Sequence, residues 1–69
     1  MKRVRLGSTA MAAVTCDEEM RSLDVEFRGG DTCRYFNVSK PIYRELLKAE
    51  SAGAYWNEVK DKFTYVKLD

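Results

Sequence analysis

Basic and aromatic side chains alternate near the middle of the chain, and this is the pattern most suggestive of chemistry. Arg34 lies between Cys33 and Tyr35, and Phe36 follows. Modules that bind single-stranded RNA stack bases on aromatic side chains of a sheet, beside arginine or lysine. A basic first strand could also contact phosphates. We therefore expect a site for RNA or another single-stranded nucleic acid, formed by Arg3, Arg5, Arg34, Tyr35, Trp56 and Asn57.

The same residues have a structural interpretation, which stays open. A small domain needs its aromatic side chains for its core. Trp56 is the larger of two adjacent aromatics that cannot both point straight inward, so we expect it to be partly exposed. Ser51 can cap a helix, Gly53 can allow a close approach to another backbone, and Asn57 can bond to a neighbouring main chain.

The residue types in the chain give little indication of a catalytic site. The chain has no histidine, which removes the commonest general base. Cys16 and Cys33 are too few for a structural zinc site, and residues 17–19 lack the spaced oxygen ligands of a calcium loop. Gly29-Gly30 indicates a turn and no phosphate loop. We expect no enzyme activity, no cofactor and no metal.

Size and composition predict one domain over residues 1–69. The formal charge of +1 favours no particular partner. No apolar run has the length of a signal peptide or a membrane span, so we expect a cytoplasmic protein without membrane contact. The two cysteines then are reduced thiols. A disulfide would require Cys16 and Cys33 to lie on adjacent strands.

Alternating apolar residues predict strands near residues 2–6, 10–16, 21–28 and 32–38. In the clearest one, Leu23, Val25 and Phe27 share a face. Gly29-Gly30 then suits a hairpin turn, and the length of its loop decides the register. A two-residue loop would pair Val25 with Arg34. A three-residue loop, Gly29-Gly30-Asp31, would pair Phe27 with Cys33 and Val25 with Tyr35; we favour it because it leaves Arg34 outside the core.

Two helices should follow the strands. Ser39 is a plausible N-cap for a helix over residues 40–50, and Ser51 for a second helix. Residues 64–68 alternate again and form either a short strand or an extended tail. The predicted architecture is α+β, an antiparallel sheet of three or four strands with two C-terminal helices on one face. Its expected core is Leu23, Val25, Phe27, Ile42, Leu46, Leu47, Val59 and Phe63.

Three segments of the chain resemble the KTSC domain, a module found at the C-terminus of some lysyl-tRNA synthetases and as a free-standing bacterial or phage protein. They are Leu23 to Phe27 with Cys33 to Phe36 and Val38, then Tyr43 to Ala49, and finally Ser51 to Asn57 with Tyr65 downstream. Ser8-Thr9 also matches. The chain departs from the family at its central Tyr-x-Tyr, which is Cys33-Arg34-Tyr35 here.

The resemblance implies an α+β fold and no established activity. RNA binding is suggested by the association with the synthetase. We therefore expect a non-catalytic binding module, with RNA as the first candidate ligand. The contrasting hypothesis is a protein-interaction adaptor that binds a partner chain in a groove between helix and sheet edge.

Overall fold

The computed structural model describes residues 2–68, and within that range the chain forms strands first and helices second. β5 is the exception, since it follows both helices. The elements are β1 (Lys2–Arg5), β2 (Met11–Asp17), β3 (Ser22–Phe27), β4 (Thr32–Phe36), α1 (Lys40–Lys48), α2 (Ala52–Val59), the short 3₁₀ helix η1 (Lys60–Lys62) and β5 (Tyr65–Lys67). No helix among these residues has the length and apolar character needed to cross a bilayer.

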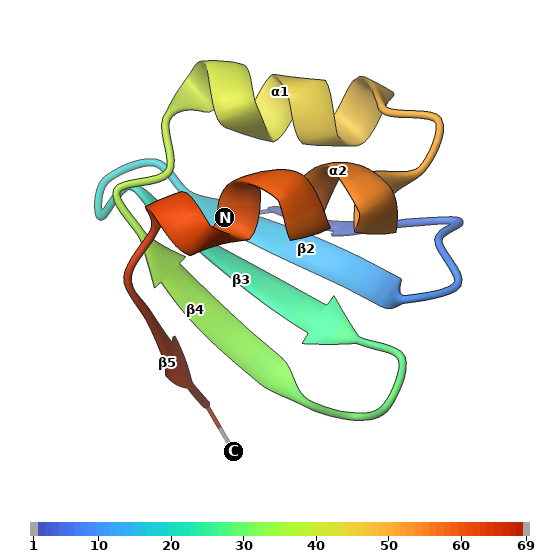
Figure 1. The fold of residues 1–69 in the computed structure, drawn as a ribbon. Helices are drawn as coiled ribbons and strands as arrows, with labels where there is room; N and C mark the ends of the chain where they lie inside the picture. Colours follow the sequence, from blue (N-terminus) through green and yellow to red (C-terminus); the bar gives the residue numbers. More distant parts are fainter. Residues whose placement is uncertain (1, 69) are drawn as a thin grey trace.

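Each strand pairs with its sequence neighbour, so the sheet order is β1-β2-β3-β4-β5 and every pairing is antiparallel. Both helices cover the same face (Figure 1). The α+β architecture is as expected, but the predicted count of three or four strands is wrong. The additional strand is β5, which confirms the short-strand alternative for residues 64–68. It spans three residues and reaches β4 only after both helices, with Tyr65 opposite Tyr35.

The hairpin between β3 and β4 has a three-residue loop, placed one residue earlier than predicted. Phe27 N donates to Asp31 O at 2.8 Å, so the loop is residues 28–30. Gly30 N donates to Phe27 O at 3.0 Å, and Gly30 has a φ of 101°. A turn followed by a left-handed glycine is the usual form of such loops, and a residue with a side chain would be strained there.

The shift of the loop changes which residues of β3 and β4 lie opposite one another, but each side chain keeps its face of the sheet. Val25 lies opposite Cys33 and Leu23 opposite Tyr35, so the predicted pairs Phe27–Cys33 and Val25–Tyr35 are wrong. The error is two residues in register, and side chains alternate with a period of two. Cys33 and Tyr35 therefore still face the helices, and Arg34 faces the opposite side.

The core lies between the sheet and the two helices. Among the expected members, Leu23, Val25, Leu46 and Val59 are buried, while Phe27, Ile42 and Phe63 are half-buried against them. Leu47 is 40% exposed, so its assignment to the core is wrong: Leu46 occupies the position on α1 that points inward. Trp56 is 1% exposed, which contradicts the expectation that it would be partly exposed.

The cysteines lie on β2 and β4, which are separated by β3. Both thiols are free. The condition for a disulfide, adjacent strands, is not met.

Serine precedes both helices, but only one of the two serines caps with its side chain. Ser51 Oγ accepts a hydrogen bond from Ala54 N at 3.2 Å, whereas Ser39 makes no such bond at the start of α1. We expect Ser51→Ala to lower the free energy of unfolding by about 1 kcal/mol, since an orphan amide loses its acceptor. Urea denaturation measures this difference.

Ser39→Ala is the matched control and should change the stability by less than about 0.5 kcal/mol. Equal losses in the two variants would contradict the assignment of the cap to Ser51.

Candidate functional site

The sheet face that the helices leave uncovered carries the three predicted arginines. Arg3 lies opposite Thr15 on β2, and the same row continues through Asp24 on β3 to Arg34 on β4. Arg5 follows on β1, two residues along and on the same face. The structure therefore brings these three basic side chains to one surface, as the nucleic-acid hypothesis requires.

Two of the three arginines are bound to carboxylates on that face. Arg3 Nε and Nη2 donate to Glu26 at 2.8 and 3.0 Å, and Arg34 Nε and Nη2 donate to Asp24 at the same two distances. Each hydrogen bond raises the pKa of its arginine, and the bond from Arg3 lowers the pKa of Glu26. The positive charge of Arg3 and Arg34 is thereby largely offset.

Tyr35 and Trp56 lie on the other side of the sheet, beneath the helices. Their ring centroids are 4.9 Å apart and nearly perpendicular, and Trp56 also stacks on Phe63 at 5.7 Å. Burial raises the pKa of Tyr35, and the indole N–H of Trp56 partly opposes this rise in pKa. Within residues 2–68 that N–H has no hydrogen-bond partner of ordinary geometry. With Tyr35 4% exposed and Trp56 1% exposed, neither ring offers a face to a base.

Asn57 occupies a third location, exposed on α2. The six residues predicted for nucleic-acid binding thus divide between the open sheet face, the core and the helix surface. Phe36, the second ring of the basic and aromatic pattern in the sequence, lies on the open face opposite Ser22 and is half-buried.

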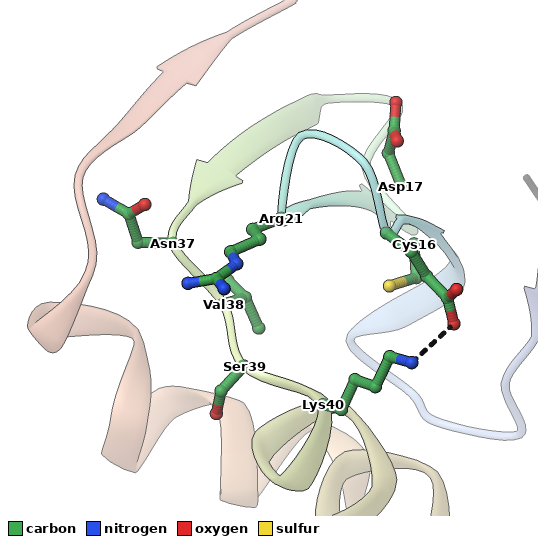
Figure 2. Close-up of a pocket in the computed structure, with 8 residues that line it drawn as sticks. Cys16, Asp17, Arg21, Asn37, Val38, Ser39 and Lys40 are labelled. Atoms are coloured by element: carbon green, nitrogen blue, oxygen red, sulfur yellow. Dashed lines mark ion pairs between the residues drawn. The ribbon is translucent and has the colours of Figure 1, made fainter.

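A separate pocket lies between the β2–β3 turn and the connection from β4 to α1 (Figure 2). Its volume is about 310 Å³. Arg21 and Asn37 line it with φ angles of 54° and 60°, the only non-glycine residues with positive φ in the described part of the chain. Val38 N donates to Arg21 O at 2.9 Å and links the two segments. The sequence did not indicate this pair, because an arginine gives no sign that its φ angle will be positive.

The two carboxylates at this pocket are already engaged. Asp17 Oδ1 accepts from Glu19 N and Met20 N at 3.1 and 3.2 Å, and Glu18 pairs with Lys40 at 3.5 Å (Figure 2). Burial, followed by the charge of Glu18, raises the pKa of Cys16, so the thiol remains protonated at neutral pH. Residues 2–68 contain no cluster of three histidine, cysteine or acidic residues that could hold a metal ion.

A groove of about 330 Å³ runs between the β1 edge and the end of α1. Val4 and Leu6 of the first strand region form one wall, and Leu46 and Leu47 of α1 form the other. Ala49 and Ala52 continue its apolar lining, and Arg5, Ser8 and Glu50 add polar groups to it. Leu47, misassigned to the core from its spacing, belongs to this surface. The alternation of Val4 and Leu6 was the sequence feature that could have pointed to it.

Taken together, the structure defines a small α+β domain, an antiparallel meander with one helix-covered face and an apolar groove at its first edge. The profile of the KTSC domain matches residues 7–63, and the chain belongs to that family. A crystal structure of a KTSC domain protein from Yersinia pestis superposes with a TM-score of 0.91 at 27% sequence identity, covering 99% of this chain and 97% of the other.

Two relatives are similar over most or all of their length. An uncharacterized protein from Stutzerimonas stutzeri is 35% identical over 71 residues, covering 100% of both chains. A protein from Tsukamurella paurometabola is 37% identical over 62 residues, covering 88% of this chain and 92% of its own.

Proposed function

We propose that this domain is a non-catalytic protein-interaction module and that a partner chain binds in the groove between β1 and α1. The observation that carries the proposal is the exposure of Leu47, at 40%, beside Val4 and Leu6. An apolar side chain exposed in a concave surface at a sheet edge gains free energy when a partner covers it.

Nucleic-acid binding remains the second candidate because three arginines share the open sheet face. Two considerations favour the groove. Asp24 and Glu26 offset two of those arginines, and affinity for nucleic acid depends on uncompensated positive charge. The rings intended for stacking, Tyr35 and Trp56, are also buried.

The test is a selection of short random peptides displayed on phage against the folded domain, with binding of the selected peptides measured at two salt concentrations. Leu47→Glu places a charge in the groove and should weaken their binding at least about tenfold. Binding of peptides to the groove should fall with salt less steeply than RNA binding, for which counterion release gives a steep dependence.

Met20→Glu is the matched control, since Met20 is 60% exposed in the β2–β3 turn, away from the groove. It should leave peptide binding unchanged. Single-stranded poly(U) is measured in parallel. The proposal fails if no selected peptide is sensitive to Leu47→Glu, or if poly(U) binds in a salt-dependent manner and the peptides do not bind.

A further inference from the structure

The groove lies beside a strand whose outer edge is open. β1 is the first strand of the sheet and, among the described residues 2–68, pairs only with β2. Leu6 N donates to Ala12 O at 2.9 Å, which makes Leu6 and Ala12 a hydrogen-bonded pair. Such pairs alternate along an antiparallel ladder. The backbone groups of Arg3 and Arg5 therefore point away from β2, toward the edge.

The side chains of β1 alternate between two different environments. Val4 and Leu6 face the helix side and line the groove, next to Leu47. By their register Arg3 and Arg5 project to the open side of the sheet, and Arg5 also lines the groove. Side chains directly opposite one another on adjacent strands share a face. A strand added to β1 would thus place alternate residues against the apolar groove and the intervening ones beside the two arginines.

Charge at this edge favours an acidic segment. Lys2, Arg3 and Arg5 follow one another along β1, and among residues 2–68 Arg5 has no ion pair. Arg44 and Lys48 are exposed on α1, the helix that forms the other wall. Glu50 is the one acidic residue among those that line the groove. Opposite charge across an interface raises the association rate and excludes partners of the wrong sign.

We propose that β1 accepts an extended segment of a partner protein as a sixth strand, and that apolar residues alternate with acidic residues in this segment. The inference rests on the proposed function and specifies its partner and its mode of binding. The main chain supplies hydrogen bonds to Arg3 and Arg5, the apolar residues fill the groove beside Leu47, and the acidic residues face Arg5.

The probe is an end-capped heptapeptide of alternating leucine and glutamate, compared with its leucine–lysine counterpart. We expect the acidic peptide to bind at least about tenfold more tightly than the basic one, as measured by isothermal titration. Equal affinities, or tighter binding of the basic peptide, would overturn the acidic specificity.

N-methylation tests the strand geometry directly. Alternate residues of an added strand donate their N–H to β1, while the others point outward. Methylating the nitrogens of one residue type should abolish binding, and methylating the other type should preserve it. Loss at the glutamates indicates antiparallel addition and loss at the leucines indicates parallel addition. Equal effects of both modifications would overturn strand addition.

Arg5→Pro and Arg5→Ala form a matched pair on the protein side. Both remove the same charge, but only proline removes the outward N–H, and an edge position tolerates it. We expect Arg5→Pro to bind the peptide about tenfold more weakly than Arg5→Ala, with cooperative melting retained in both. Sensitivity to Leu47→Glu without sensitivity to N-methylation would leave partner binding intact and remove strand addition. If binding did not depend on Leu47, both partner binding in the groove and strand addition to β1 would be contradicted.

Discussion

Replacing Trp56 with alanine should lower the free energy of unfolding by about 3–5 kcal/mol, the largest effect that we expect from a single substitution. Trp56 is fully buried between Tyr35, which meets it edge-on, and Phe63, which stacks on it. Alanine removes both ring contacts and leaves a cavity beneath α2. Domains of this size have a stability of only several kcal/mol, so the variant should be largely unfolded at moderate temperature.

The measurement is equilibrium denaturation followed by far-ultraviolet circular dichroism, because the variant lacks the indole fluorophore. Tyr65→Ala serves as the control: Tyr65 also contacts Tyr35, with centroids 5.3 Å apart, but is 57% exposed. It should lose less than about 1.5 kcal/mol. A loss below about 1 kcal/mol in Trp56→Ala would contradict the packing described above.

The second large effect is expected at Gly53, in the first turn of α2. A Cβ at this position would lie 3.1 Å from Ala10 Cβ and 3.1 Å from Ser8 Oγ. Ser8 Oγ accepts hydrogen bonds from Ala10 N and Met11 N at 3.1 and 3.2 Å, so it holds the turn that precedes β2. Gly53→Leu should force helix and turn apart and destabilise the domain by about 1–3 kcal/mol.

Ala54→Leu is the matched control, because it introduces the same side chain one position later at an exposed site. Its stability should remain within about 0.5 kcal/mol of the parent protein. Thermal and urea denaturation of the two variants should therefore diverge clearly. If Gly53→Leu is as stable as Ala54→Leu, the close contact between α2 and the Ser8–Ala10 turn does not constrain the fold.

Local patterns along the chain were sufficient to predict the elements that depend on them. The alternation of Leu23, Val25 and Phe27 identified β3, and the position of Ser51 identified the start of α2. The faces of β4 followed from the physical cost of burying Arg34. These features depend on residues that are near one another in sequence, so they can be predicted from the sequence alone.

Features set by distant contacts could not be predicted in the same way. The sequence of α2 does not indicate which of Tyr55 and Trp56 points inward. In the structure Trp56 is buried against Tyr35 and Phe63, whereas Tyr55 is half-buried. Leu47 has the helical spacing of a core residue, but in the structure it is exposed and lines the groove beside β1. Arg34 was predicted to lie outside the core, but the pairing of Arg3 with Glu26 and of Arg34 with Asp24 depended on register across strands.

The late position of β5 in the chain has a consequence for synthesis on the ribosome. The first four strands are joined by short turns, whereas Tyr65 pairs with Tyr35 across both helices. Until residues 65–67 emerge, β4 is the edge of the sheet, with its outward amides unpaired. Exposed edges of that kind invite pairing with other chains. Once β5 pairs with β4, the edge strand on this side of the sheet has three residues in place of five, and short edge strands are one way in which proteins limit such pairing.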